Sequence, residues 1–170
     1  MKKNEKTGLL VPLLFAVYLA LLIWIILFKL EFSISVLKTN RSINLIPFYY
    51  ENEIGMGFHL KEVLENAVIF IPLGIYLCML KHDFSVKVKF IFILMISLIL
   101  EISQYILAVG RTDVTDLITN TCGGMAGVGL YWLSVKVFRN KERLDFIITI
   151  LAAVATIVAI GLLAILLIVN

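Results

Sequence analysis

Long apolar runs are the feature that most constrains how this chain can fold. The first of them, residues 9–28, has about the 20 residues that a helix needs to cross a hydrocarbon core of ~30 Å. Hydrophobic residues make up 61% of the 170 residues and charged residues only 16%, whereas about a quarter of the residues in soluble domains are charged. The sequence therefore predicts an integral membrane protein.

Five such runs predict an all-α fold, a polytopic transmembrane bundle of five helices. The expected helices are 9–28, 63–80, 88–109, 113–137 and 146–169. Lys2, Lys3 and Lys6 precede the first run, as basic residues do in a signal peptide. The run is longer than a typical signal-peptide core and no A-x-A-like cleavage site follows it, so we expect an uncleaved helix.

The distribution of Lys and Arg predicts the orientation of the bundle. With the N-terminus in the cytoplasm, the basic residues of the inner side are Lys2, Lys3, Lys6, Lys81, Lys87, Lys89, Lys136, Arg139, Lys141 and Arg143. Those of the outer side are Lys29, Lys38, Arg41, Lys61 and Arg111. Because cytoplasmic loops are enriched in Lys and Arg, the N-terminus is predicted to lie inside and the C-terminus outside.

The longest loop, residues 31–61, lies on the outer side in this topology. Its middle combines Asn44 and Pro47, which favour turns, with Phe48 and Tyr49. Aromatic residues of this kind favour the membrane interface. The loop is expected to lie on the bilayer surface or to dip into it.

Polar residues interrupt the third and fourth apolar segments, where a charged side chain costs about 2.5–3.5 kcal/mol on insertion scales. One face of the third helix carries Ser97, Glu101, Gln104 and Ala108, at helical spacings. One face of the fourth carries Asp113, Asp116, Asn120, Gly123, Gly124 and Gly127. A tight turn at 110–112 is predicted to bring these faces together, with Asn44 and Asn66 on the same outer side.

Several of these residues have a purely structural explanation. Asp113 could cap the fourth helix, and Asp116 could favour the positive end of its dipole. The glycines, spaced as GxxxG, could serve close helix packing. Glu101 lies well inside its helix and has no such explanation. It must be protonated, hydrogen-bonded to Gln104 or paired with Arg111.

The polar group offers two kinds of chemistry. Three carboxylates with Asn66 or Asn120 supply hard oxygen ligands, so a divalent cation such as Mg²⁺, Ca²⁺ or Mn²⁺ could bind. A carboxyl group in apolar surroundings can also act as an acid or a base. No Ser/His/Asp set is visible, because His59 is expected in the outer loop and His82 on the inner side. No basic patch with interleaved aromatic residues is present, so nucleic acid is not expected as a partner.

Four motifs resemble those of the VanZ-like family of bacterial membrane proteins. They are N-L-I-P-F at 44–48, N-A-V-I-F-I-P-L-G at 66–74, E-I-S-Q at 101–104 and T-D-V-T-D-L-I-T-N-T-C-G-G at 112–124, in the family's order. The family takes its name from a factor that gives low-level resistance to the lipoglycopeptide teicoplanin. The resemblance therefore implies a protein of the bacterial cytoplasmic membrane that is connected with the cell envelope.

The resemblance also implies a domain organisation and a set of characteristic residues. Residues 1–145 would form a VanZ-like four-helix membrane domain with its motif core at 44–131, and residues 146–170 an additional C-terminal transmembrane helix. The characteristic residues map onto Asn44, Pro47, Phe48, Asn66, Pro72, Gly74, Glu101, Gln104, Asp113, Asp116, Asn120 and Gly124.

The leading hypothesis is an outer-leaflet pocket that binds an amphiphile, either a membrane lipid or a lipid-linked envelope precursor, and affects teicoplanin resistance. Its expected ligand-binding residues are Asn44, Asn66, Glu101, Gln104, Arg111, Asp113, Asp116 and Asn120. Structural roles are expected for Pro47, Phe48, Pro72, Gly74, Gly123, Gly124 and Gly127.

Two other functions are compatible with the same residues. A membrane-embedded lipid hydrolase or transferase, with or without a metal, would use Glu101, Asp113 and Asp116 as acid, base or ligands. A small proton-coupled transporter would use Glu101 as a proton relay. Against transport, the polar residues do not extend into the cytoplasmic half and no inverted repeat is visible. The sequence leaves open the metal, the oligomeric state and whether catalysis occurs.

Overall fold

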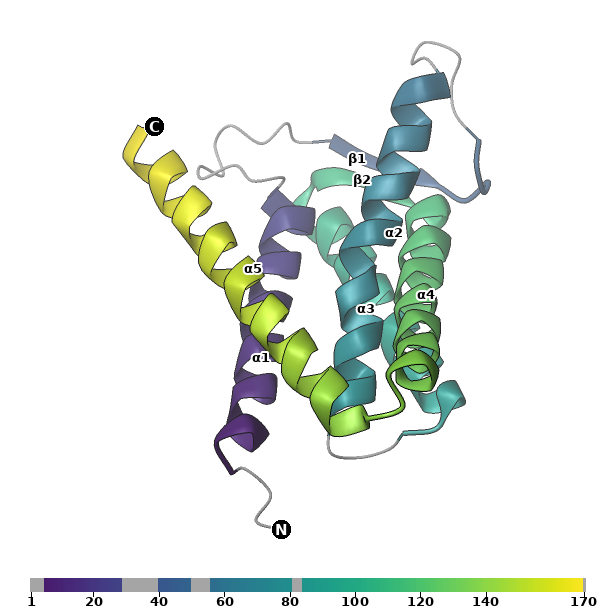
Figure 1. Cartoon of the computed structure of the whole chain (residues 1–170). Coiled ribbons are helices and arrows are strands. Elements are labelled where there is room, and N and C mark those ends of the chain that lie inside the picture. The colour runs from purple at the N-terminus through teal and green to yellow at the C-terminus, as the bar shows by residue number, and fades with distance from the viewer. Residues whose placement is uncertain (1–4, 29–39, 50–55, 81–83, 170) are drawn as a thin grey trace.

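The computed structural model describes residues 5–28, 40–49, 56–80 and 84–169, which form five helices and a two-stranded sheet (Figure 1). The helices are α1 (Glu5–Phe28), α2 (Met56–Met79), α3 (Val86–Leu107), α4 (Val114–Phe138) and α5 (Lys141–Val169). The strands are β1 (Asn40–Asn44) and β2 (Val109–Asp113). The predicted all-α bundle of five helices is confirmed, and the small sheet is an addition to it.

Four of the described helices are long and apolar enough to cross a membrane. The apolar segments are Leu9–Leu27 in α1, Leu60–Met79 in α2, Val86–Leu107 in α3 and Lys141–Ile165 in α5. α4 is more polar, and it packs extensively against α2 and α3. Its buried residues are Thr115, Thr119, Asn120, Thr121, Gly123, Gly124, Gly127, Val128 and Tyr131. The bundle therefore buries much of its most polar helix.

Glycines determine how closely α2 and α4 approach each other. A Cβ atom at Gly123 would collide with the backbone carbonyl of Ala67, and Gly127 meets the α2 backbone in the same way. From the other side, a Cβ atom at Gly74 would collide with the carbonyl oxygen of Gly124. The two backbones are in direct contact at this crossing, as small residues allow. This contact brings the polar start of α4 against α2.

A parallel pair of strands covers the end of the bundle opposite the N-terminus (Figure 1). The register sets Asn40 against Val109 and Asn44 against Asp113. The tight turn predicted at 110–112 is wrong, because these residues form β2 and their backbone groups find partners in β1. The helix ends instead at Ala108, the C-cap of α3, which has a φ of 55°. We call this end of the bundle the strand end.

α2 begins earlier than its apolar run predicts. Its first residue is Met56 rather than residue 63, so His59 belongs to a helix and not to a loop. Hydropathy marks the part of a helix suited to hydrocarbon, whereas backbone hydrogen bonds can continue the helix into polar surroundings. Pro72 lies inside α2, and His82 lies outside the described residues.

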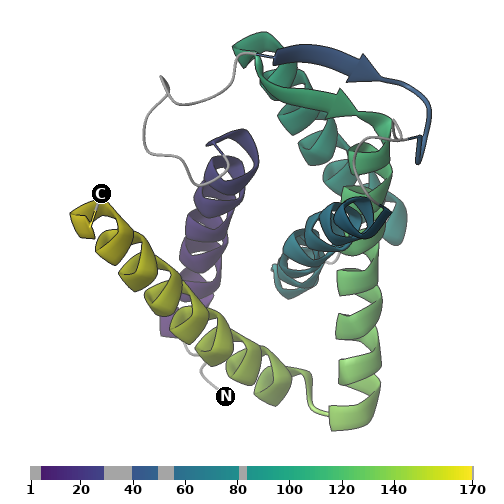
Figure 2. The ribbon, with the colours of Figure 1, turned by 90° about the horizontal axis from the view of Figure 1, so that it is seen from above.

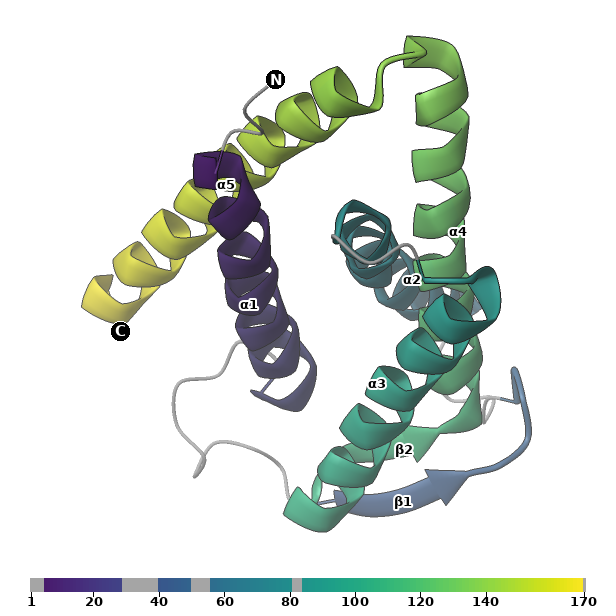
Figure 3. The same ribbon diagram turned by 90° about the horizontal axis from the view of Figure 1, so that it is seen from below.

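α1 and α5 form the more loosely packed side of the bundle. Figures 2 and 3 show α5 running diagonally past α1, away from α3. α5 begins at Lys141 rather than at residue 146, because the Asn140 side chain accepts a hydrogen bond from the N–H of Arg143 at 3.0 Å and caps the helix. The Tyr131 hydroxyl of α4 donates to Asp145 at 2.7 Å and ties the start of α5 to α4.

Candidate functional site

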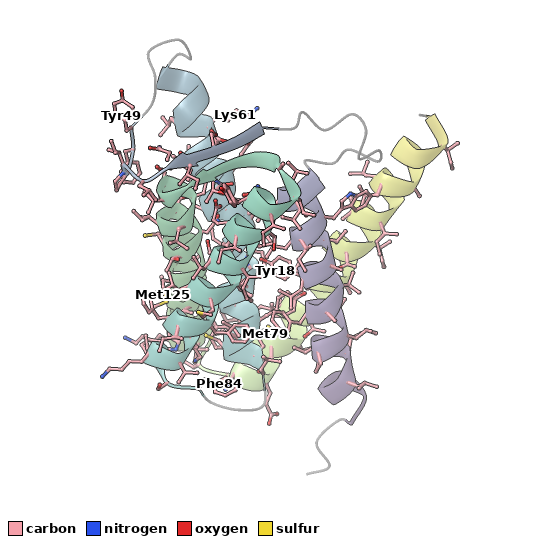
Figure 4. The ribbon with its side chains drawn as sticks, turned by 180° about the vertical axis from the view of Figure 1, so that it is seen from behind. Tyr18, Tyr49, Lys61, Met79, Phe84 and Met125 are labelled. Atoms are coloured by element: carbon pink, nitrogen blue, oxygen red, sulfur yellow. The ribbon has the colours of Figure 1, made fainter. Side chains whose placement is uncertain are left out.

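The structure brings polar residues from five elements to the strand end. They come from β1, α2, α3, β2 and α4, and hydrogen bonds between side chains or to backbone groups connect them. Figure 4 shows Tyr49 and Lys61 at this end and Phe84 at the opposite end. The site is therefore localised at one end of an otherwise apolar bundle.

Asn44 is the residue that joins the strands to the turn that follows them. Its side-chain amide donates to Asp113 Oδ2 at 2.9 Å and to the carbonyl of Tyr49 at 3.1 Å. Its Oδ1 accepts from the N–H of Ile46 at 3.2 Å. With three hydrogen bonds and an exposed fraction of only 6%, Asn44 holds β1, the turn and the start of α4 in one arrangement.

The turn after β1 contains the rest of the N-L-I-P-F motif. Phe48 has a φ of 56°, in the left-handed region, and its N–H donates to Thr115 Oγ1 at 3.0 Å. The N–H of Tyr49 donates to the carbonyl of Ile46 at 3.3 Å and closes the turn. The turn is thus attached to the first turn of α4, while the Phe48 and Tyr49 side chains remain exposed.

Asp113 is the N-cap of α4. Its Oδ1 accepts from the N–H of Thr115 at 2.8 Å, and its Oδ2 accepts from Asn44. Both carboxylate oxygens therefore take part in structural hydrogen bonds, in agreement with the cap that the sequence offered as one explanation.

Glu101 lies on α3 with an exposed fraction of 3%. Its Oε2 accepts from the N–H of Asp113 at 3.0 Å, and its backbone carbonyl accepts from Thr112 Oγ1 at 3.1 Å. The carboxyl groups of Asp116, Asp113 and Glu62 are near enough to interact electrostatically with that of Glu101. The end of the bundle is therefore rich in acidic groups.

The partners expected for Glu101 are not the ones observed. Gln104 donates from Nε2 to the carbonyl of Ile26 in α1 at 3.0 Å rather than to Glu101. Arg111 lies in β2, and its side chain is outside the part that the structure describes. The observed partner is a backbone group, the N–H of Asp113 at the end of β2.

Two further pairs connect α4 to its neighbours. Asn66 of α2 donates to Asp116 Oδ1 at 2.7 Å. Asn120 donates from Nδ2 to Ser97 Oγ on α3 at 3.1 Å, and both residues are fully buried. Asp116, Asn120 and the glycines thus occupy a face of α4 that meets α2 and α3 together.

Two buried amide oxygens have no hydrogen-bond partner among the described residues. They are Oε1 of Gln104 and Oδ1 of Asn120. A buried polar group without a partner costs about 1–3 kcal/mol. The strand end therefore contains hydrogen-bond acceptors that no described residue satisfies.

Thr115 and Ile26 also belong to this arrangement, although they were not predicted from the sequence. Thr115 is almost fully buried, and its position two residues after a capping Asp in T-D-V-T-D was a signal that could have found it. Ile26 contributes only its carbonyl, for which a sequence carries no signal. Ser97 was placed on the polar face of α3 without a partner, and Asn120 is that partner.

The described acidic residues of the strand end take part in hydrogen bonds. No group of three or more His, Cys, Asp or Glu side chains within the described ranges is arranged to bind a metal ion. Asp113 is committed to the cap, which leaves Glu101 and Asp116 as the carboxylates in contact with the remaining polar groups. The arrangement can accept hydrogen bonds from a polar group that enters the strand end.

Residues 15–139 match the VanZ/LLP1 family, from the middle of α1 to the end of α4. The chain belongs to the VanZ/LLP1 family. It is 44% identical over 137 residues to Protein VanZ from Enterococcus faecium, which covers 79% of this chain and 81% of that relative. No solved structure matches the chain. With its family and its four apolar helices, this VanZ/LLP1 chain is a membrane protein. Its polar residues at the strand end all lie within the matched region, and α5 lies beyond it.

Proposed function

We propose that this VanZ/LLP1 protein is a cell-envelope protein of the bacterial cytoplasmic membrane whose strand end binds an amphiphile in the outer leaflet. The amphiphile is a membrane lipid or a lipid-linked envelope precursor, and its binding lowers the sensitivity of the cell to teicoplanin. The similarity to Protein VanZ supports the connection with teicoplanin, through the resistance factor from which the family takes its name.

One observation carries the proposal: buried polar side chains from β1, α3, β2 and α4, together with the half-buried Asn66 of α2, gather at a single end of the bundle. Polar groups at membrane depth are costly, and in membrane proteins they mark functional sites by default. A helix cap alone would account for Asp113 but not for Glu101, Gln104 and Asn120. Binding of a polar headgroup gives these remaining groups a role.

The charge distribution supports an outward-facing site. The strand end lies opposite the N-terminus in the bundle (Figure 1). The positive-inside distribution of Lys and Arg favours a cytoplasmic N-terminus, which would place the strand end in the outer leaflet. Lipoglycopeptides act on that side of the membrane.

The hydrogen bonds favour binding over catalysis. A hydrolase or transferase that uses three carboxylates would need Asp113, whose two oxygens accept from Thr115 and Asn44. Glu101 and Asp116 could still perform acid–base chemistry, and turnover of an envelope lipid by the purified protein would favour an enzyme instead.

Substitution of Glu101 and Asp116 tests the proposal in cells. In a strain whose teicoplanin tolerance depends on this gene, Glu101→Gln and Asp116→Asn should each reduce tolerance toward that of a strain with an empty vector. Glu65→Gln is the matched control. Glu65 lies next to Asn66 in α2, but its side chain is exposed and pairs with Lys61. Unchanged tolerance in both site variants, at equal amounts of protein in the membrane, would exclude the proposed role.

A further inference from the structure

Basic residues gather at the end of the bundle opposite the strand end, where α4 connects to α5. Figure 1 shows this connection at the end of the bundle where α1 begins. We call residues 136–143 the basic connection, because four of them are basic: Lys136, Arg139, Lys141 and Arg143. All four are exposed, and none forms an ion pair with a described residue. Glu142 and, one turn further on, Asp145 offset only part of the charge.

Helix stability does not explain where three of these basic residues lie. Lys141 and Arg143 lie in the first turn of α5, at the positive end of the helix dipole, where cations are unfavourable. Arg139 is the C-cap of α4 with a φ of 53°, a left-handed conformation in which glycine is the usual residue. Only Lys136, in the last turn of α4, is favoured by the dipole of its own helix. An anion outside the protein would give all four residues a role.

An exposed tryptophan lies beside this charge. Trp132 precedes Lys136 by four residues, so the two side chains share one face of α4, and Trp132 is 52% exposed. Trp is enriched where the hydrocarbon of a membrane meets the headgroups, and long basic side chains reach from that depth toward the surface. From Trp132 through Lys136 to Arg139, α4 therefore changes from apolar to positive, as a phospholipid changes from acyl chain to phosphate.

We propose that the basic connection binds an anionic phospholipid, with Trp132 against its acyl chains and Lys136 and Arg139 at its phosphate. Anionic leaflets attract basic segments next to membrane helices. With the N-terminus in the cytoplasm, the lipid belongs to the cytoplasmic leaflet. This lipid site is independent of the proposed function, which concerns the opposite end of the bundle. The positive-inside rule accounts for basic residues in a cytoplasmic loop but predicts no preference for one lipid at Trp132.

Trp132 can report directly on the lipid beside it. Trp24→Phe leaves Trp132 as the only tryptophan of the full-length chain, which is reconstituted in phosphatidylcholine vesicles with increasing fractions of dibrominated phosphatidylglycerol or dibrominated phosphatidylcholine. Bromine quenches tryptophan fluorescence on contact, so the two curves give the affinity for phosphatidylglycerol relative to phosphatidylcholine. This ratio should be at least about threefold. Sodium chloride at about 1 M, where the screening length is about 3 Å, should bring it close to one.

The second tryptophan provides the matched control for position. Trp132→Phe leaves Trp24, which lies half-buried in α1 toward the strand end and away from the basic connection. The ratio measured at Trp24 should be close to one. A ratio raised equally at both tryptophans would show a general attraction of anionic lipid to the protein and would overturn a site at the basic connection. A ratio close to one at Trp132 would overturn it as well.

Substitutions in the chain with Trp132 alone assign the preference to named residues. Lys136→Gln and Arg139→Gly together should lower the ratio to about 1.5-fold or less. Glycine adopts a φ of 53° without strain, so Arg139→Gly by itself should lower the ratio in a protein at least as stable as its parent. Lys61→Gln removes an exposed positive charge at the strand end and should keep the full ratio. A ratio that survives the double substitution, or that Lys61→Gln lowers equally, would contradict the proposed site.

Discussion

α4 and α5 are consecutive helices of 25 and 29 residues, yet they occupy opposite environments. α4 carries Asp116, Asn120 and a run of glycines, and it packs against α2 and α3. α5 is apolar over Lys141–Ile165, and only 6% of its most apolar window is buried. In this bundle, the more apolar helix is the more exposed one. This difference is expected where lipid rather than water is the solvent, because small and polar residues then hold helices together.

The largest expected difference in stability between changes in α4 and changes in α5 comes from substitution of their glycines. Gly123→Ala in α4 should destabilise the protein by about 3 kcal/mol or more, because its Cβ atom would collide with the Ala67 carbonyl and the helices would have to separate. Gly161→Ala in α5 is the matched control. Its Cβ atom would meet nothing within 4 Å, so it should be neutral or stabilising by up to about 1 kcal/mol. Unfolding in detergent micelles, followed by circular dichroism, gives both values. Equal losses would show that the α2–α4 contact is not special.

Substitution of the N-caps of α4 and α5 allows a second comparison of the two helices, with smaller expected losses of stability. Asp113→Ala removes the cap of α4, its bond with Asn44 and part of the surroundings of Glu101, and should cost about 2 kcal/mol or more. Asn140→Ala removes only the exposed cap of α5 and should cost about 1 kcal/mol or less. Free energies of unfolding in the same micelles measure both costs. A larger loss for Asn140→Ala would contradict the view that the start of α4 is the organised part of the molecule.

The helices and their polar faces were predictable from the sequence because they depend on local patterns. Apolar runs predicted five helices, and the spacing of Ser97, Glu101 and Gln104 predicted one face, which is buried. The pairing of β1 with β2 was not predictable, because it joins segments 69 residues apart and depends on backbone groups rather than on a side-chain period. The partner of Glu101 was missed for the same reason.

The sequence indicated that helices pack closely, but not which helices are in contact. The GxxxG spacing indicated close packing of α4, but not that α2 would be its partner. The bond between Asn66 and Asp116 follows from that crossing, and the bond of Gln104 to a carbonyl of α1 follows from the position of a third helix. Such contacts depend on tertiary structure, which a single sequence does not specify.

The smallest expected effect concerns the attachment of α5 to α4. Tyr131→Phe removes the hydrogen bond to Asp145 and should cost about 1 kcal/mol. Tyr105→Phe on the exposed face of α3 is the control and should change stability by less than about 0.5 kcal/mol. The same unfolding measurement applies to both variants. A loss above that of Asp113→Ala would mean that α5 is as important to the fold as α4.

The proposed outer-leaflet site requires the strand end to face the outside of the cell. A chain with Cys78→Ala and Cys122→Ala would carry either Leu45→Cys, in the exposed turn after β1, or Lys87→Cys, at the opposite end of the bundle. Intact cells are treated with a membrane-impermeant maleimide. We expect labelling of the Leu45→Cys protein in intact cells and of the Lys87→Cys protein only after permeabilisation. The reverse pattern would place the polar cluster in the cytoplasmic leaflet and contradict the proposed outer-leaflet site.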